Sequence, residues 1–322
     1  MSRLLCLPLR SSLAIPFLAL ASACGSLQPV DQRAFPGLAG SLRDFMKQAE
    51  EGDADAQFLV GLAYDEGQRV AEDNRAAAGW YRRAADQGHA PAQNNLGLLY
   101  YVGDGVEQDL AEAAKWFGRA SEQDFAPAQC NRGVLYLFGQ SVPQDLEIAH
   151  MLLVAAAEQD DARAQRLLGW TYEEGLGVEA DPDRARHWYG ASARGGNPHA
   201  QLRFGSMLLE EGSDDEAAAD WIERAAERGI PDAQALLGRL HLDGRGVARS
   251  DTRAAVWLER AALQGNSLAQ YNLALLCAKG SGVEQDAERA RQWLRRAADQ
   301  GLQVAQTKLD QLERTIRVAS VD

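Results

Sequence analysis

Cysteine is scarce in this sequence, which has four in 322 residues. Cys6 and Cys24 lie near the N-terminus, so Cys130 and Cys277 are the two that remain in the rest of the chain. These two are far apart in the sequence, in segments that we expect to be separated by more than the roughly 7 Å between α-carbons that a disulfide allows. The fold is therefore expected to depend on packing and not on disulfides.

The sequence lacks the short motifs that mark common active sites. It has no Ser-x-x-Lys, no Gly-x-Ser-x-Gly, no His-Glu-x-x-His and no P-loop, and its five histidines are scattered. Gly175-Leu176-Gly177 and Gly244-Arg245-Gly246 resemble half of a dinucleotide-binding loop, but no strand pattern precedes them and the third glycine is missing. We therefore predict no catalytic residues, no metal site and no cofactor, and interpret the protein as not an enzyme.

Basic residues are too few to balance the acidic ones. The chain has 33 Lys and Arg against 46 Asp and Glu, a net charge of −13. The first 23 residues carry Arg3 and Arg10 and no acidic residue, so their removal would take away two positive charges and leave −15. An acidic surface repels phosphate, and no stripe of Lys or Arg offsets it. Nucleic acid is therefore not expected as a partner.

The apolar run near the N-terminus is short. Arg3 and Arg10 precede the apolar residues 12–20, and small residues follow up to Ala23. This run is shorter than the roughly twenty residues that span a bilayer, and the arrangement is typical of an export signal. We predict a signal peptide over residues 1–23. Leu20-Ala21-Ser22-Ala23-Cys24 resembles the lipobox of bacterial lipoproteins, which implies lipidation of Cys24 and a flexible tether over residues 24–41.

This interpretation predicts a lipoprotein that faces the periplasm and touches the membrane by its N-terminal lipid only. Gly25 follows the cysteine, where aspartate favours inner-membrane retention in some bacteria, so the outer membrane is the preferred location. Leu20 stands one place earlier than in the usual lipobox. Cleavage by the ordinary signal peptidase after Ala23 therefore remains open, and it would give a soluble periplasmic or secreted protein.

The main feature that the sequence does contain is a repeated block. An Ala-Gln pair opens each block, and successive pairs are thirty-six residues apart except for one step of thirty-three. The pairs begin at Ala56, Ala92, Ala128, Ala164, Ala200, Ala233, Ala269 and Ala305. A fixed period of this length indicates stacked units that bury their apolar faces against their neighbours. Such an architecture presents a long surface, which favours binding over catalysis.

Each block predicts two helices. In the second block, residues 92–102 place apolar side chains on one helical stripe, with Gly97 where a second helix approaches closely. Gly103 ends this helix, and Asp109 caps a second helix over residues 110–122 that is expected to bury Trp116 between units. The cap recurs as Asp73, Asp109, Asp145, Asp181, Ser250 and Asp286, and the tryptophan as Trp80, Trp116, Trp188, Trp221, Trp257 and Trp293.

The pattern A-Q-x-x-L-G-x-x-Y-x-x-G-x-G-V-x-x-D-x-x-x-A-x-x-W, nearly complete from Ala92 to Trp116, resembles the Sel1-like repeat, a relative of the tetratricopeptide repeat. The resemblance covers roughly residues 42–312. It implies an all-α fold, a right-handed α/α solenoid of seven full repeats. It also implies an adaptor or scaffold in protein complexes, often in bacterial signalling or cell-envelope assembly.

The two ends predict half-repeat caps, which a solenoid needs for solubility. Residues 42–51 are interpreted as a lone second helix and residues 305–318 as a lone first helix. We therefore predict a solenoid over residues 42–312 and a C-terminal tail over 313–322. In the shortened fifth block, Ser213 and Glu216 are expected to form a capping box.

In related solenoids the first helix of each repeat lines the concave wall, which implies a set of partner-binding residues. These are Asn95, Tyr101, Asn131, Phe138, Arg166, Trp170, Arg203 and Asn272. Asparagine amides suit an extended peptide backbone, aromatic side chains suit apolar anchors, and arginines suit a carboxylate. Trp170 is the only tryptophan outside the second-helix place. The alternative for each residue is structural, with solvated amides and with aromatic side chains packed between units.

From these observations we predict a protein-interaction scaffold or regulator of the bacterial cell envelope that binds another envelope protein or peptide along its concave face. The alternative is an envelope protein that binds or acts on a glycan, peptidoglycan or exopolysaccharide, with aromatic side chains stacked on sugars. The absence of paired acid and base residues makes the catalytic form of this alternative the weaker one.

Overall fold

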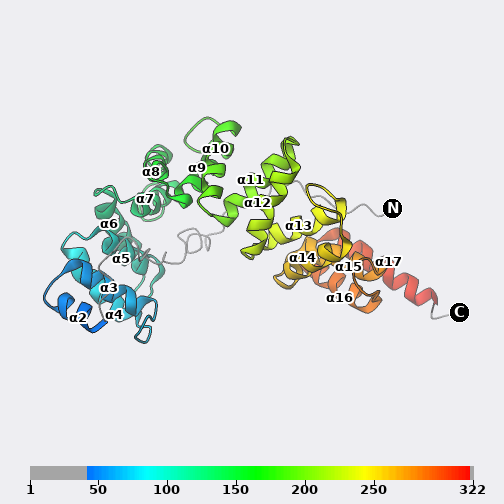
Figure 1. Cartoon of the computed structure of the whole chain (residues 1–322), viewed down its shortest axis with the longest axis horizontal. Coiled ribbons are helices and arrows are strands. Elements are labelled where there is room, and N and C mark those ends of the chain that lie inside the picture. Colours follow the sequence, from blue (N-terminus) through cyan, green and yellow to red (C-terminus); the bar gives the residue numbers. More distant parts are fainter. Residues whose placement is uncertain (1–41, 320–322) are drawn as a thin grey trace. The chain divides into compact units, whose positions relative to one another are not determined.

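A computed structural model describes residues 42–319, with side chains up to residue 312. The predicted signal peptide, Cys24 and the tether over residues 24–41 lie outside the described residues. Within them every regular element is a helix and none is a strand, so the all-α prediction is confirmed (Figure 1). No helix of this described part is both long and apolar enough to cross a membrane.

The described residues form two compact blocks, 42–195 and 196–319. The N-terminal block contains α2 (Leu42–Glu50), α3 (Ala54–Asp65), α4 (Asn74–Asp86), α5 (Ala90–Val102), α6 (Leu110–Ser121), α7 (Ala126–Phe138), α8 (Leu146–Glu158), α9 (Ala162–Glu174) and α10 (Pro182–Arg194). The C-terminal block contains α11 (Pro198–Glu211), α12 (Asp215–Glu227), α13 (Pro231–Asp243), α14 (Asp251–Leu263), α15 (Ser267–Lys279), α16 (Ala287–Asp299) and α17 (Gln303–Ala319). From α3 onward, odd-numbered helices open a repeat and are called helix A, and even-numbered helices are called helix B.

Helix A and helix B of one repeat pack together through a glycine. A Cβ atom added to Gly97 of α5 would lie 2.7 Å from the ring of Phe117 in α6, closer than real Cβ contacts allow. The ring therefore lies directly on the helix backbone, which confirms the close approach predicted at Gly97. The residue that fills this space follows the tryptophan place and is buried in every repeat, as Tyr81, Phe117, Leu153, Tyr189, Ile222, Leu258 and Leu294.

The helix-B tryptophans are shallower than predicted. Trp116 and Trp293 are buried, but Trp80, Trp188, Trp221 and Trp257 keep partial exposure. Successive helical residues point about 100° apart, so the tryptophan faces the junction between repeats when the next residue faces helix A. In five repeats an arginine three residues later places its guanidinium carbon 4.4 to 4.6 Å from the indole ring centre. The indole is thus covered partly by a cation on the surface.

The glutamine of the Ala-Gln pair joins neighbouring repeats. Gln93 Nε2 donates to the carbonyl of Ala85 near the end of α4 at 3.0 Å, and Gln93 Oε1 accepts from Gln123 Nε2 at 2.7 Å. The same two bonds occur at Gln57, Gln234 and Gln270. The last carbonyls of a helix lack partners inside the helix. A buried glutamine therefore caps the preceding helix B and accepts from the glutamine that follows its own helix B.

The loop between the helices of one repeat touches the preceding repeat. A Cβ atom added to Gly105 would lie 2.2 Å from the carbonyl oxygen of Asn74, the first residue of α4. Gly177, Gly246 and Gly282 make the same close approach. The equivalent residue in the next repeat after Gly105 is Ser141, which has the left-handed φ of 58°. Both the left-handed backbone conformation and the close contact favour glycine at this place, although Ser141 and Arg69 also adopt the left-handed φ.

The predicted caps of helix B are confirmed. Asp73, Asp109, Asp145, Asp181, Ser250 and Asp286 each accept from one or two amides of the first helical turn. The capping box predicted for the fifth repeat is wrong. Asp214 caps α12 by accepting from the Ala217 amide at 2.9 Å, whereas Ser213 still belongs to the turn after α11, where its amide donates to the Leu208 carbonyl. The cap is one residue later than expected because the turn after α11 includes Ser213.

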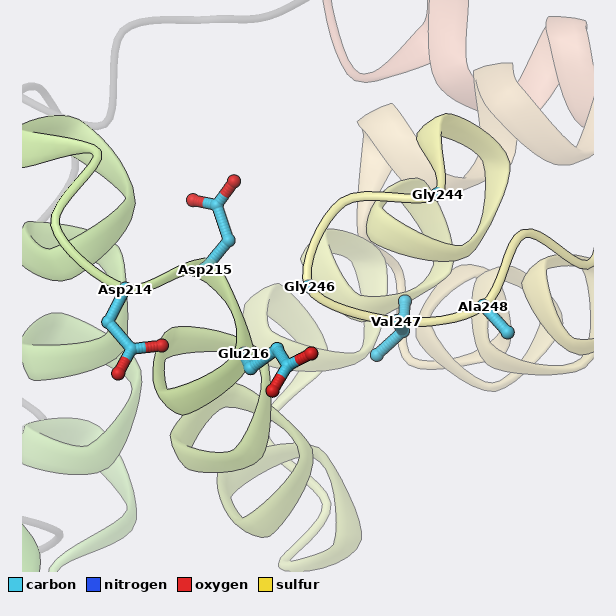
Figure 2. Close-up of a pocket in the computed structure, with 7 residues that line it drawn as sticks. All are labelled: Asp214, Asp215, Glu216, Gly244, Gly246, Val247 and Ala248. Atoms are coloured by element: carbon cyan, nitrogen blue, oxygen red, sulfur yellow. The ribbon is translucent and has the colours of Figure 1, made fainter.

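The short loop of the fifth repeat borders a shallow pocket in the C-terminal block. Figure 2 shows Asp214, Asp215 and Glu216 at the start of α12, opposite the loop 244–248 of the next repeat. Arg245 of that loop donates to both carboxylate oxygens of Asp215, at 2.8 and 2.9 Å, and holds the pKa of this carboxyl below its usual range. Arg245 therefore neutralises the charge of Asp215, one of the three acidic residues that line this pocket.

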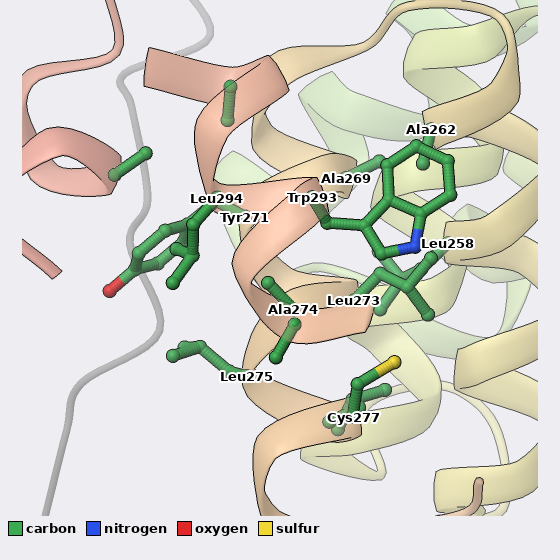
Figure 3. Close-up of a cluster of buried hydrophobic side chains, with 14 of the residues drawn as sticks. Leu258, Ala262, Ala269, Tyr271, Leu273, Ala274, Leu275, Cys277, Trp293 and Leu294 are labelled. Atoms are coloured by element: carbon green, nitrogen blue, oxygen red, sulfur yellow. The ribbon is translucent and has the colours of Figure 1, made fainter. Parts of the chain in front are cut away.

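Both ends of the described region carry a lone helix. At one end α2 packs on α3 around Ala49, and at the other α17 adds Ala305 and Leu309 to a core shared by α14, α15 and α16. Figure 3 shows part of this core, in which Leu258, Leu273 and Leu294 come from three different helices. Helix α17 continues to Ala319, into the segment predicted as a tail. Cys130 and Cys277 are buried, and neither forms a disulfide with another described residue.

Candidate binding face on the first helices of the repeats

Side chains connect the A helices of consecutive repeats in the N-terminal block. Asn131 Nδ2 of α7 donates to Asn94 Oδ1 of α5 at 2.8 Å, and the Tyr101 hydroxyl donates to Gln140 Oε1 at 2.9 Å. On the next pair of helices, the rings of Phe138 and Trp170 stack with their centres 6.1 Å apart and their planes 22° apart. These contacts place α5, α7 and α9 side by side. We call the surface formed by Asn95, Tyr101, Asn131, Phe138, Arg166 and Trp170 the helix-A face.

The two asparagines of this face lie in different surroundings. Asn131 is 2% exposed and bonded to Asn94, so its amide links α5 to α7. Asn95 keeps partial exposure, and its Oδ1 accepts from Asn94 Nδ2 at 3.3 Å. The bond between Asn94 and Asn131 was not anticipated, although their places, third in one repeat and fourth in the next, are a sequence signal that would find it.

The aromatic residues of the face are half-buried and lie at two junctions, between α5 and α7 and between α7 and α9. Phe138 ends α7 and Trp170 lies in the middle of α9, so their stack joins two repeats. Tyr101 near the end of α5 reaches Gln140, which follows α7 and is itself buried. Gln140 was missed by the sequence interpretation because it lies in a loop and not on a helix.

The two predicted arginines differ in their partners. Arg203 of α11 in the C-terminal block pairs with Glu210 at 3.1 Å. Arg166 of α9 is half-buried, and among the described residues no hydrogen bond or ion pair reaches its guanidinium. Burial lowers the pKa of Arg166, and the neighbouring Arg163 lowers it further, whereas Tyr189 and Cys130 act in the opposite direction. Arg166 is thus a half-buried cation that no anionic side chain of the described region pairs with.

Asn272 lies on the A helix α15 of the C-terminal block. It is 5% exposed, and its Oδ1 is buried without a hydrogen-bond partner in the described part of the chain. The reason lies one repeat earlier, because Ala235 occupies the place from which Asn94 bonds Asn131. Asn272 therefore occupies the same repeat position as Asn131, but the preceding A helix offers no asparagine to bond it.

One acidic group beside helix A has unusual electrostatics. Asp65 ends α3, and its Oδ2 accepts from the Tyr81 hydroxyl at 2.9 Å. Burial raises the pKa of Asp65 to about 6, and the carboxylates of Glu66, Asp104 and Glu72 raise it as well, against the lowering effect of Tyr81. Within the described residues no group of three or more His, Cys, Asp or Glu side chains could hold a metal ion.

Comparison with known proteins identifies the repeat. A family model described as Sel1 repeat matches residues 54–89, 90–125, 126–161, 162–197, 198–230, 231–266 and 267–302. No curated protein matches the chain.

Two solved structures are similar over most of the chain. A protective antigen present in uropathogenic Escherichia coli strains, which displays an SLR fold, shares 34% identity with a TM-score of 0.74, over 85% of this chain and 59% of that one. A Sel1 repeat protein from Oxalobacter formigenes shares 37% identity with a TM-score of 0.64, over 84% of this chain and 79% of that one. The chain thus spans little more than half of the first structure. Seven consecutive matches and both structures agree that this chain belongs to the Sel1 repeat family, whose members are generally scaffolds for protein–protein interaction.

Proposed function

We propose that this protein is a scaffold or regulator of the bacterial cell envelope that binds another protein or peptide along the helix-A face of its N-terminal block. The observation that carries the proposal is the stack of Phe138 on Trp170 beside Arg166, whose guanidinium has no hydrogen-bond or ion-pair partner within residues 42–312. An aromatic pair next to an available cation offers both an apolar anchor and a charged contact, the two features that dominate binding energy at protein interfaces.

Repeat packing does not require a tryptophan at position 170. The equivalent places of the other six repeats hold Leu62, Leu98, Val134, Ser206, Arg239 and Leu275. A place that accepts aliphatic, polar and charged residues is not fixed by the core, so the large ring at Trp170 is explained better by a ligand than by stability. Its half-buried position leaves part of the indole available for contact.

The proposed envelope location rests on the N-terminal sequence. Basic residues, an apolar run and small residues precede Cys24, in the order of a bacterial lipoprotein precursor. We propose that Cys24 carries the lipid and that the repeats face the periplasm from the outer membrane. Mass spectrometry of the mature N-terminus tests this: an acylated Cys24 is expected, and an unmodified Cys24 or another first residue would contradict it.

The binding proposal is tested by affinity purification from envelope extracts. The bait is the full chain, compared with a variant carrying Phe138→Ala and Trp170→Ala and with the control Met151→Ala. Met151 lies on the helix-B side of the same block and is 66% exposed, so its truncation leaves the fold and the helix-A face unchanged. We expect a protein retained by the wild type and the control and lost by the double variant. Retention by all three would refute the proposed face, and retention of glycan alone would favour the glycan-binding alternative.

A further inference from the structure

Other arginines of the A helices form ion pairs, whereas Arg166 forms none with the described residues. Arg203 pairs with Glu210, and Arg239 of α13 pairs with Asp243 at 3.1 Å. Near Arg166, two acidic residues of its own helix region are already engaged. Asp161 caps α9 and pairs with Arg163 at 3.1 Å, and Glu173 accepts from the Tyr189 hydroxyl at 2.8 Å. No carboxylate is among the ionisable groups that act on Arg166. Within residues 42–312, therefore, no anion pairs with this cation, which can accept one from a ligand.

The desolvation of Arg166 is unfavourable without an anion. A buried cation is stabilised only when hydrogen bonds and an opposite charge replace its lost water. A carboxylate matches the planar guanidinium, because its two oxygens accept two parallel N–H bonds. The seam between α7 and α9 thus favours a ligand that brings one carboxylate to Arg166.

The stack of Phe138 and Trp170 offers a second contact to a ligand, at a fixed distance from Arg166. Trp170 is four residues after Arg166, so both side chains lie on one face of α9, about 6 Å apart along the helix axis. In an extended peptide, side chains two residues apart point to the same side and are separated by about 6.6 Å. An acidic residue and an apolar residue with one residue between them therefore match the distance from Arg166 to the stack of Phe138 and Trp170.

We propose that Arg166 binds the side-chain carboxylate of an acidic residue in an extended partner segment, and that an aromatic or aliphatic residue two positions away packs on Phe138 and Trp170. The inference rests on the proposed function and names the chemistry of its partner. An internal acidic residue fits better than a chain end, because Arg166 and Trp170 lie in the middle of α9 and the helix-A face continues past both, to Tyr101 on α5.

The test uses synthetic peptides of nine residues in a Gly and Ser background, acetylated and amidated so that their termini carry no charge. The reference peptide contains Glu-x-Trp. The others replace Glu by Gln, replace Glu by Lys, replace Trp by Ser, or place Glu and Trp next to each other. Fluorescence anisotropy measures the binding of each labelled peptide to the full chain and to three variants: Arg166→Met, Trp170→Ala and the control Arg239→Met, whose arginine is already paired.

We expect the full chain to bind Glu-x-Trp at least about tenfold more tightly than the Gln, Lys and Ser peptides, since a charge-assisted pair is worth more than a neutral hydrogen bond. The adjacent Glu-Trp peptide is also expected to bind more weakly, because its two side chains point to opposite sides. Arg166→Met is expected to remove the preference for Glu over Gln while Trp binding remains. Arg239→Met is expected to behave like the wild type. Circular dichroism shows whether each variant is folded, and Arg166→Lys provides a second folded variant that keeps part of the preference.

Three results would overturn the inference: equal binding of the Glu and Gln peptides, a preference for Glu that survives Arg166→Met in a folded protein, or absence of binding by all peptides at millimolar concentration. One further peptide, Gln-x-Trp with a free carboxyl terminus, tests the choice of an internal acidic residue. If it binds more tightly than the amidated Glu-x-Trp peptide, that choice is overturned. If these peptides fail while an envelope partner is still lost on replacing Phe138 and Trp170, the inference fails and the proposed function stands. If that partner is retained as well, both fail.

Discussion

The glycine between helix A and helix B offers the sharpest test of the packing. In Gly97→Ala, the new Cβ atom would lie 2.7 Å from the Phe117 ring, and such overpacking costs about 1 to 3 kcal/mol. Alanine also gains about 1 kcal/mol of helix propensity over glycine. Gly118→Ala in α6 is the matched control, because nothing lies within 4 Å of its added Cβ. It should keep the propensity gain without the steric cost, so the two variants are expected to differ in stability by about 1 to 3 kcal/mol.

The assay is urea unfolding followed by circular dichroism, combined with hydrogen exchange of the peptides from α5 and α6. Exchange is needed because repeat proteins unfold in local steps, so a global midpoint alone does not locate the change. The seventh repeat suggests the rescue: Ala274 and Leu294 occupy the places of Gly97 and Phe117. Adding Phe117→Leu to Gly97→Ala is expected to recover stability relative to the sum of the two single changes. If Gly97→Ala is as stable as Gly118→Ala, the direct contact between ring and backbone is refuted.

Three further predictions concern polar groups and loop strain. Asp65→Asn is expected to stabilise the protein above pH 6 and to lose this effect as the pH falls towards 4. The reason is that the raised pKa of Asp65 makes ionisation of its carboxyl unfavourable in the folded state. Urea midpoints of the wild type and the variant are compared across this pH range, and a difference in midpoint that does not change with pH would contradict the prediction. Gln93→Leu removes one hydrogen bond to the Ala85 carbonyl and one from the Gln123 amide, which keep their bonds to the Gly88 amide and the Arg119 carbonyl. The loss of two bonds is expected to lower the free energy of unfolding by about 1 to 3 kcal/mol, measured in urea, and an unchanged value would contradict it. Ser141→Gly is expected to stabilise the protein by about 1 kcal/mol by relieving the left-handed backbone, and a lower unfolding midpoint would refute this.

The fold was predictable because the sequence repeats its local signals. The Ala-Gln pair marks the start of helix A, a glycine marks its end, and a capping aspartate marks the start of helix B. Each signal recurs at the same place in most repeats, and this agreement supports each boundary. The errors arose where neighbouring residues have similar chemistry. Ser213 and Asp214 are both good caps, and the length of the preceding turn decides between them. Trp80 and Tyr81 are both large aromatic residues, and only the rotation of α4 against Gly61 shows that the tyrosine fills the seam.

The candidate face was predictable in position and less so in chemistry. The fourth place of the repeat led to Asn131, but its bond to Asn94 depends on how two helices lie against each other. Arg166 and Arg203, at the third and fourth places of their repeats, were predicted to have the same role. Their difference depends on Glu210, which is seven residues after Arg203 and reaches it only through the helix geometry.

The most direct test of the central claim is photo-crosslinking in cells of the native host. A photo-reactive phenylalanine derivative replaces Trp170 on the helix-A face in one strain and Met151 on the helix-B side in another. The account predicts a discrete protein adduct from position 170 and none from position 151. An adduct from position 151 together with none from position 170 would contradict binding along the helix-A face.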